Sequence, residues 1–326
     1  MIITRTPLRI SLGGGGTDLP SFYRANSHGF LIAAAITKYV YLSVNKNFDD
    51  DILLKYSEVE RAASLDDVHH PLLRECLRAS GVEGRVEVTS TADVPAGTGL
   101  GSSGSFAVGA LKALHLYRHR TPSADQLAQE ACEIEINKLQ EPIGKQDQYI
   151  AAHGGISAFT FRDDESVQVE RLEISELTRL QLEDNLLLFY TGVKRSASAA
   201  ILSEGKLDKN PKVHIDNLHE TRAIGYKTRD LLLNGEMEVF GKILTEQWSL
   251  KYLRQPSLLH EEINNWINIG IAAGAVGGKL VGAGGGGFLL FYANNKMGLR
   301  LAMERIGLPE ISFGVDYEGS SFVVVR

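Results

Sequence analysis

Several features that mark other classes of protein are missing from this sequence of 326 residues. It has only two cysteines, Cys76 and Cys132, which excludes a disulfide-rich secreted scaffold and is typical of a reducing compartment. No apolar run reaches the ~18 residues that a membrane helix needs. Residues 1–7 lack the apolar core of a signal peptide. We therefore expect a cytoplasmic protein with no membrane partner.

Positive charge is also scarce, because 34 Lys and Arg stand against 40 Asp and Glu, for a formal net charge of −6. A nucleic-acid partner would favour a basic surface, so we expect none. The P-loop pattern G-x-x-x-x-G-K-[ST] has no match, since residues 277–280 lack its hydroxyl. What the sequence does have is a 44% share of hydrophobic residues and 33 glycines, most notably in three dense clusters. This length allows two domains, and the clusters point to ligand loops.

The order of the expected elements indicates an α+β fold. Strand patterns occupy residues 1–12, 31–48, 85–90, 156–161, 186–190, 279–281, 288–291 and 322–325. Helix patterns occupy residues 66–80, 105–118, 124–139, 212–234, 237–253 and 257–273, with Ser123 as an N-cap and a short helix after the polar loop 142–149. The two kinds mix without regular β-α-β alternation. Charge rises over 162–184, so we predict an N-terminal domain over 1–165 and a C-terminal domain over 166–326.

The second glycine cluster, residues 95–104, reads Pro-Ala-Gly-Thr-Gly-Leu-Gly-Ser-Ser-Gly between an expected strand and helix. Its glycines allow φ > 0, and successive N–H groups with a helix N-terminus bind anions. The predicted nucleotide-binding residues are Pro95, Gly97, Thr98, Gly99, Leu100, Gly101, Ser102, Ser103 and Gly104. Two other interpretations remain: a dinucleotide-binding G-x-G-x-x-G over 99–104, although helix replaces the strand and acid that should follow, and a plain turn without a ligand.

Three carboxylates stand near this loop or the other clusters. A Mg2+–nucleotide site needs at least one carboxylate or hydroxyl, which Glu135 and Ser103 would supply. Asp147 follows Lys145 in a polar loop, and a neighbouring cation favours a carboxylate that accepts a proton in phosphoryl transfer. Asp147 could equally be a cap or turn residue. Asp18, at the end of the first glycine cluster, is suited to hold vicinal hydroxyls or to cap a helix before Pro20.

Together the three clusters resemble those of the GHMP kinases, the superfamily of galactokinase, homoserine kinase, mevalonate kinase and phosphomevalonate kinase. Residues 95–104 match the P-x-G-x-G-L-G-S-S-A loop of this family, with Gly104 in place of Ala. Residues 279–287 match its third motif, and residues 7–12 match its opening strand. The resemblance covers nearly the whole chain. It implies a two-domain GHMP-kinase-like fold, an active site in the cleft between the domains, and ATP and Mg2+ as cofactors.

The resemblance also implies roles for single residues. Ser103 and Glu135 correspond to the Mg2+ partners, and Asp147 to the catalytic base. Arg9 corresponds to the cation near the transferring phosphoryl group, with Lys145 as a second candidate for that charge. The galactokinase pattern G-E-H-T-D here has Gly15 and Gly16 in place of Glu and His, which leaves room for a larger sugar. The predicted substrate-binding residues are Gly14, Gly15, Gly16, Thr17, Asp18, Arg195, Gly285 and Gly286.

Residues 9–20 and 144–149 look closest to the branch that contains D-glycero-D-manno-heptose 7-phosphate kinase and bacterial fucokinase-like enzymes. The expected reaction turns ATP and a heptose 7-phosphate into ADP and the 1,7-bisphosphate, for nucleotide-activated heptose synthesis. Arg195 would anchor the resident phosphate, unless it forms a surface ion pair. Alternatives are a kinase of another sugar such as L-fucose, a mevalonate-type ATP-dependent decarboxylase, and a non-catalytic ATP and sugar sensor. Adenine is expected near residues 56–70, and a homodimer is left open.

Overall fold

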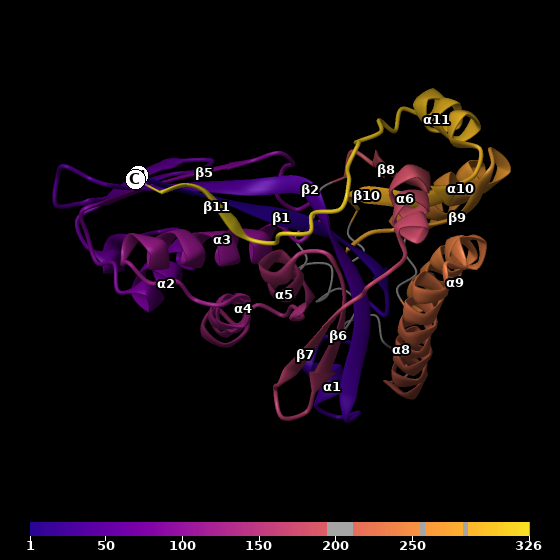
Figure 1. Ribbon diagram of the computed structural model, residues 1–326, viewed down its shortest axis with the longest axis horizontal. Helices are drawn as coiled ribbons and strands as arrows, with labels where there is room; N and C mark the ends of the chain where they lie inside the picture. Colours follow the sequence, from indigo (N-terminus) through magenta and orange to yellow (C-terminus); the bar gives the residue numbers. More distant parts are fainter. Residues whose placement is uncertain (194–210, 255–257, 283–285, 326) are drawn as a thin grey trace.

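A computed structural model describes residues 1–193, 211–254, 258–282 and 286–325 of the chain. Its larger sheet is built on two long antiparallel strands, β1 (Ile2–Gly13) and β2 (His28–Lys46) (Figure 1). The second half of β2 pairs with β5 (Val86–Ala92), and its first half pairs with β6 (Ile156–Arg162). The last strand, β11 (Ser321–Val325), runs back to pair with β1.

Three further strands complete this eight-stranded sheet. β3 (Ile52–Lys55) lies parallel to β5 and carries the edge strand β4 (Val59–Ala62), while β7 (Val167–Arg171) pairs with β6. Two of the eight strands, β7 and β11, thus come after residue 165 in the chain. The domain boundary at residues 165 and 166 stays a prediction.

Helices pack on one face of this sheet (Figure 1). They are α2 (Pro71–Ser80), α3 (Ser102–Tyr117), α4 (Ala124–Cys132) and α5 (Gln146–His153), with the π-helical turn η2 (Glu133–Lys138) extending α4. α3 can approach β1 closely because Gly109 has no side chain: a Cβ there would lie 2.7 Å from Thr6 Oγ1. The close packing places the N-terminus of α3 beside the middle of β1.

The second half of the chain has a three-stranded sheet in the order β8-β10-β9. Its strands are β8 (Leu186–Tyr190), β9 (Ala275–Leu280) and β10 (Phe288–Ala293). Its helices are α6 (Glu176–Asn185), α8 (Pro211–Asn234), α9 (Met237–Arg254), α10 (Leu258–Ala272) and α11 (Lys296–Arg305). Buried Trp248, Phe291 and Leu299 belong to its own apolar core, whereas Phe240 and Phe288 join the core of the first half. The two halves are therefore packed against each other.

The α+β class is confirmed, and each expected strand and helix within the described residues is present. The short elements α1 (Pro20–Tyr23), β3, β4, β7, α6 and α11 are additional. The helix predicted over 66–80 begins only at Pro71, because His70 caps it with Nδ1 accepting from Leu73 N at 3.2 Å. Residues 65–67 form a separate 3-10 turn, η1. Ser123 caps α4 as predicted, in a reciprocal capping box with Gln126.

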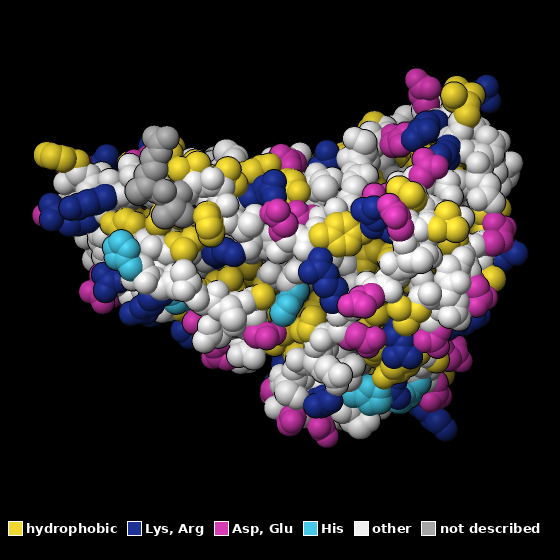
Figure 2. Space-filling view, in the orientation of Figure 1, with side chains coloured by type: hydrophobic (Ala, Val, Ile, Leu, Met, Phe, Trp, Pro, Cys, Tyr) yellow, Lys and Arg dark blue, Asp and Glu magenta, His cyan; other side chains and the backbone are white. Residues whose placement is uncertain are grey.

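The surface in Figure 2 carries acidic and basic side chains interspersed over all elements in view. This face has no large area of a single sign. Across the part of the chain that the structure describes, no helix has the length and apolar character to cross a membrane.

Candidate active site

Both halves of the chain line one cavity of about 1190 Å³. The first half contributes Arg9 and the loop 95–104, and the second half contributes α9, β9, and Gly282 and Gly286 of the third glycine cluster, residues 282–287. The two loops touch through their backbones, because a Cβ on Gly282 would lie 2.5 Å from Gly99 O. A Cβ on Gly287 would lie only 1.9 Å from Thr98 O. Glycine is therefore required where the loops meet.

The loop 95–104, here called the anion cradle, has the backbone conformation that its sequence predicts. Gly97, Gly99 and Gly101 have φ values of 76°, 78° and 76°, a left-handed conformation that other residues adopt at a cost. Gly101 is also the N-cap of α3, whose first N–H groups have no partner within the helix. These N–H groups and the positive end of the helix dipole suit a phosphate. Most of the nine predicted residues line the cavity: Pro95, Gly97, Gly99, Gly101, Ser102, Ser103 and Gly104.

Thr98 and Leu100 are buried and shape the loop instead of lining the cavity. Thr98 Oγ1 donates to Pro95 O at 2.9 Å. Leu100 O accepts from Arg9 N at 2.9 Å, which ties the loop to β1. Their role in nucleotide binding stays a prediction, and in this structure they hold the conformation of the loop.

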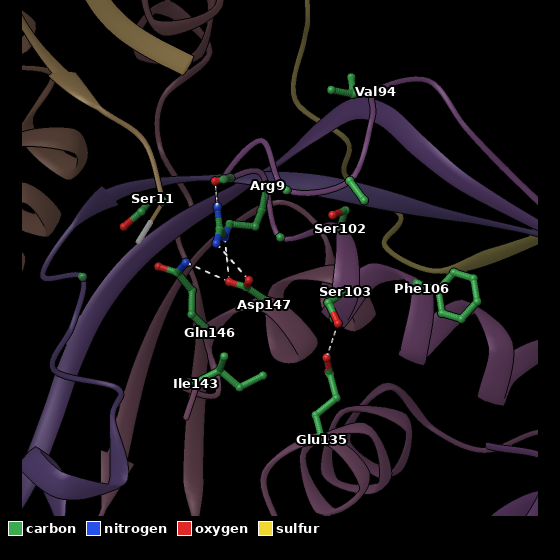
Figure 3. A pocket seen from close by; sticks show the side chains of 18 of the residues that line it. Arg9, Ser11, Val94, Ser102, Ser103, Phe106, Glu135, Ile143, Gln146 and Asp147 are labelled. Atoms are coloured by element: carbon green, nitrogen blue, oxygen red, sulfur yellow. Dashed lines mark hydrogen bonds and ion pairs between the residues drawn. The ribbon is translucent and has the colours of Figure 1, made fainter. Parts of the chain in front are cut away.

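Arg9 and Asp147 form a bidentate ion pair at the centre of the cavity (Figure 3). Arg9 Nε donates to Asp147 Oδ1 at 2.7 Å, and Nη2 donates to Oδ2 at 2.9 Å. Arg9 Nη1 donates to Gly99 O at 2.6 Å, so one guanidinium joins the carboxylate to the anion cradle. Gln146 Nε2 adds a hydrogen bond to Oδ1 at 3.1 Å. The carboxylate is therefore fixed in orientation beside the place where phosphate would bind.

Lys145 does not join this group. Its Nζ lies 2.8 Å from Glu165 Oε2 and 5.1 Å from the centre of the Tyr23 ring, and its side chain does not line the cavity. The cation that pairs with Asp147 is Arg9 and not Lys145. Residues 145 and 147 are close in sequence, but at the start of α5 their side chains leave the helix in different directions. Lys145 is therefore not placed to offset charge next to Asp147.

Ser103 and Glu135 face each other across the cavity wall (Figure 3). Ser103 Oγ donates to Glu135 Oε1 at 2.5 Å, and Gln148 Nε2 donates to Oε2 at 2.6 Å. Glu135 lies on η2, and such π-helical turns often occur at functional sites. Despite the two hydrogen bonds, burial raises the pKa of Glu135 to about 7. A cation bound here would favour the carboxylate form.

The hydroxyl oxygen of Ser103 and the carboxylate oxygens of Glu135 suit Mg2+. This ion prefers oxygen ligands, keeps several waters and takes few ligands from the protein. Among the described residues, no three or more His, Cys, Asp or Glu side chains gather as a metal site of their own. A hydroxyl and a single carboxylate beside the anion cradle are the composition expected for a metal that arrives with a nucleotide. The predicted role of both residues remains a proposal.

The raised pKa of Glu135 predicts a pH-dependent stability in the absence of metal and nucleotide. The carboxyl group ionises near pH 4.5 in the unfolded chain and near pH 7 in the folded protein. Because ionisation favours the unfolded chain within this window, the contribution of Glu135 to the free energy of unfolding falls as the pH rises from 4.5 to 7. The loss is at most about 3 kcal/mol. We expect the free energy of unfolding, measured by urea denaturation, to fall less between pH 5 and 7.5 in Glu135→Gln than in the wild type. Parallel curves for the two proteins would contradict this.

Asp18 is buried at the polar end of the cavity, next to Gly15 and Gly16. Its Oδ1 accepts from Gly16 N at 3.1 Å and its Oδ2 from Gln146 N at 3.2 Å. Burial, and the charge of Asp147, raise the pKa of Asp18. The N-cap interpretation is wrong, because the N-cap of α1 is the following residue and makes no side-chain capping bond.

The rest of the first glycine cluster supports Asp18 from behind. Thr17 is buried, with Oγ1 donating to Gly14 O and Phe30 O, each at 2.9 Å. A Cβ on Gly14 would lie 2.2 Å from Phe30 O, so this glycine packs against β2. Neither Gly14 nor Thr17 lines the cavity. The predicted substrate-binding residue Gly286, in the third cluster, lines the cavity. Two other predicted residues, Gly285 of the same cluster and Arg195, lie outside the described residues.

Gly104, which replaces the usual Ala of the loop motif, is in contact with the helix that carries Asp147. A Cβ here would lie 2.7 Å from Asp147 Cβ and 3.0 Å from its backbone C. We predict that Gly104→Ala shifts α5 and lowers kcat by roughly 10- to 100-fold, since small misplacements of reacting groups have effects of this size. Steady-state kinetics measures it. Gly314→Ala is the control, because its Cβ would meet Thr37 Oγ1 at an ordinary 3.7 Å. A wild-type kcat in Gly104→Ala would contradict the required close contact.

The sequence patterns do not point to three polar residues of α9 that line the cavity: Gln247, Lys251 and Arg254. Lys279 of β9, the first residue of the matched third motif, also lines it. Arg254 Nη1 donates to Asn217 Oδ1 at 2.6 Å, and Lys251 Nζ donates to Gly282 O. No local motif surrounds the three on α9. Lys279 could have been noticed in the sequence, because it is the one charged residue in the run of small and apolar residues 271–293.

The opposite end of the cavity is aromatic. His70 stacks on Phe106 with ring centroids 5.4 Å apart, and Tyr56 meets His70 edge-on at 4.7 Å. Burial lowers the pKa of His70. In Figure 3, Phe106 and Val94 lie beyond Ser102 as seen from Asp147. The cavity thus runs from an aromatic end, past the anion cradle, to the polar end with Asp147 and Asp18.

Comparisons with known proteins agree with this architecture. Two sequence profiles of one family match the chain, the GHMP kinases N terminal domain over residues 68–155 and the GHMP kinases C terminal domain over residues 228–306, together just over half of it. D-glycero-alpha-D-manno-heptose 7-phosphate kinase of Campylobacter jejuni is 28% identical over 309 residues, which are 90% of this chain and 89% of the relative. Galactokinase of Pyrococcus furiosus is 26% identical, with 88% of this chain and 87% of the relative covered.

The fold has solved counterparts. The crystal structure of a D-glycero-D-manno-heptose 1-phosphate kinase from Bacteroides thetaiotaomicron matches with a TM-score of 0.81 and 23% identity, over 100% of both chains. Both domain profiles and the relatives that cover most of the chain name the same family, and the fold match covers the full chain. Kinases of this family take their phosphate from ATP. The chain therefore belongs to the GHMP kinases and is a small-molecule sugar kinase, a phosphotransferase with an alcohol group as acceptor.

Proposed function

We propose that this kinase phosphorylates the anomeric hydroxyl of D-glycero-D-manno-heptose 7-phosphate to form the 1,7-bisphosphate. The observation that carries the proposal is the composition of the sugar end of the cavity. Gly15 and Gly16 leave room beside Asp18, and a Cβ on Gly16 would lie 3.8 Å from Arg254 Nη2. An open loop next to a guanidinium suits a long sugar that carries its own phosphate. The Campylobacter jejuni relative, named for this sugar phosphate, supports the same substrate class.

ATP would bind along the cavity with its base at the aromatic end and its phosphates on the anion cradle. Tyr56, His70 and Phe106 offer apolar faces for adenine. The N–H groups at the start of α3 and the residues of loop 95–104 hold the phosphates. Ser103 and Glu135 would hold Mg2+, which neutralises phosphate charge when it is bound. This arrangement points the last phosphate toward Asp147.

Asp147 would accept the proton of the anomeric hydroxyl as the phosphoryl group is transferred. Arg9 orients the carboxylate through two hydrogen bonds and brings positive charge next to the developing charge. Asp18, fixed by Gly16 N and Gln146 N, has carboxylate oxygens that accept sugar hydroxyls. Two buried atoms that line this end, Ser11 Oγ and Gln146 Oε1, have no partner among the described residues and are available to the sugar.

The test compares kcat/KM for D-glycero-D-manno-heptose 7-phosphate, the same heptose without its phosphate, and L-fucose, each with Mg-ATP and detection of ADP. We expect the phosphorylated sugar to be preferred by at least roughly 100-fold, because a site built for a charged group is left unpaired by an analogue that lacks it. Equal or better turnover of L-fucose would overturn the assignment of the substrate. Release of inorganic phosphate together with CO2 from a phosphorylated mevalonate would indicate the ATP-dependent decarboxylase. Binding of ATP and sugar without turnover would indicate the non-catalytic sensor.

A further inference from the structure

Lys279 is a buried cation in the wall of the cavity. It lies on β9 opposite Leu290 of β10, its residue is 6% exposed, and it lines the cavity. Its Nζ donates to Gln247 Oε1 at 2.8 Å. Gln247 is itself oriented, because its Nε2 donates to Leu12 O at 2.8 Å. The ammonium is therefore fixed in place, and its side chain is not a solvated surface lysine.

Among the residues that the structure describes, the charged groups that act on Lys279 are positive. An ammonium has several N–H donors, and within the described residues the neutral Gln247 amide is its hydrogen-bond partner. The charged groups that act on it are Lys251 of α9 and Arg9 of β1, both cations. Arg9 is itself already paired with the carboxylate of Asp147. Burial and these two cations lower the pKa of Lys279 to about 7.

A buried cation of this kind is costly unless an anion joins it. Structural lysines in cores are normally paired with a carboxylate, and in the described part of the chain no ion pair is formed by Lys279. The cation instead faces a cavity in which a kinase must bind phosphate groups. Lys279, Lys251 and Arg9 come from three different elements and lie together at the point where both halves of the chain meet.

We propose that Lys279 binds a phosphate group of a substrate and is a substrate-binding residue of the active site. The inference rests on the proposed kinase site but not on the identity of the sugar. The shared chemistry is a phosphate dianion, which has two sources: the terminal phosphate of ATP, next to Arg9 and Asp147, or the phosphate that the sugar already carries. The bound anion supplies a counter-charge that Lys279 does not receive from the described residues, and a further N–H of the ammonium donates to a phosphate oxygen.

Binding of phosphate should be coupled to protonation of this group. Above neutral pH part of the protein has Lys279 in its neutral form, and a bound anion favours the ammonium. A proton is then taken up from the buffer as the ligand binds. Wild-type protein should show this uptake at pH 8, where the nucleotide phosphates are already ionised, and Lys279→Met should show less.

The experiment is isothermal titration calorimetry at pH 8 in two buffers of different ionisation enthalpy. One arm titrates ATP in EDTA without sugar, and the other titrates the heptose 7-phosphate without nucleotide. Lys279→Met keeps the length of the side chain and removes the charge. We expect the arm whose phosphate contacts Lys279 to lose roughly 10- to 100-fold in affinity, the size of a hydrogen bond to a charged group, and to lose its proton uptake. Lys242→Met, on the exposed face of α9, is the control.

Loss in the ATP arm assigns the terminal phosphate, and loss in the sugar arm assigns the phosphate of the sugar. Lys279→Arg provides a second test if Lys279→Met does not fold, because arginine keeps the charge without titrating. It should retain affinity and lose proton uptake. Wild-type affinity and wild-type proton uptake for Lys279→Met in both arms would overturn the proposal. A wrong choice of sugar would be seen separately: wild-type protein would not turn over the heptose 7-phosphate, while its titration with ATP, which contains no sugar, would be unaffected.

Discussion

Asp147→Asn is expected to lower kcat by roughly 10²- to 10⁴-fold, the contribution of a positioned general base. Asparagine has nearly the same shape but accepts no proton from the sugar. It also offers Arg9 one acceptor oxygen where aspartate offers two, at 2.7 and 2.9 Å. Steady-state kinetics with saturating Mg-ATP and sugar measures the change. Because the carboxylate acts on the hydroxyl and not on the nucleotide, we expect the KM for ATP to change far less than kcat.

Asp125→Asn is the matched control for this substitution. Asp125 begins α4 and pairs with His153, at the other end of the helix that carries Asp147, with Oδ1 and Nε2 3.0 Å apart. It is an exposed carboxylate outside the cavity, so its loss should leave kcat unchanged. Thermal denaturation of both variants confirms that they are folded. A kcat near the wild-type value in Asp147→Asn would remove Asp147 from the role of base.

Arg9→Met is expected to have the second largest effect, on both stability and activity. Arg9 is almost fully buried, and its removal leaves Gly99 O without the Arg9 donor and the carboxylate of Asp147 with the hydrogen bond from Gln146 but without its cation. Breaking a buried ion pair typically costs 3–5 kcal/mol, and we expect about 3 kcal/mol because 24% of the Asp147 side chain is exposed. The variant should also lose roughly 10²- to 10³-fold in kcat, the scale of a lost electrostatic donor in an active site.

The double variant Arg9→Met, Asp147→Asn separates the two effects. It removes the unpaired carboxylate, so the free energy of unfolding from urea denaturation should recover in part toward the wild-type value. Activity should not recover, because both the base and the cation are absent. Equal stability of the single and double variants would show that Arg9 and Asp147 do not act as a pair, contrary to the structure.

The loops of the site could be predicted from sequence because their signals are local. Three glycines within five residues, followed by Ser102 and Ser103, indicate a backbone turn into a helix, and Gly97, Gly99 and Gly101 do adopt positive φ. The same holds for the helices that begin after Ser123 and end before Gly235, since caps and periodicity are contained within each segment. The α+β class followed from the order of these elements.

The partners of the charged residues could not be predicted, because they come from distant segments. Arg9 and Asp147 are separated by 138 positions and meet only when α5 packs against β1. Lys145 is the nearer cation in sequence, yet it pairs with Glu165. Lys279 depends in the same way on α9, β1 and β9 meeting. Proximity in sequence is a poor guide to ion pairs, since helix geometry separates the directions of neighbouring side chains.

The most direct test of the proposed function is phosphorus NMR of the protein with Mg-ATP and D-glycero-D-manno-heptose 7-phosphate. The proposal predicts a new anomeric phosphate signal that grows in step with ADP, while the signal of the 7-phosphate persists. Transfer of phosphate to the anomeric oxygen requires Asp147 and the sugar end of the cavity to act as described. A signal from another position of the sugar, or ADP accompanied only by inorganic phosphate, would contradict the proposal.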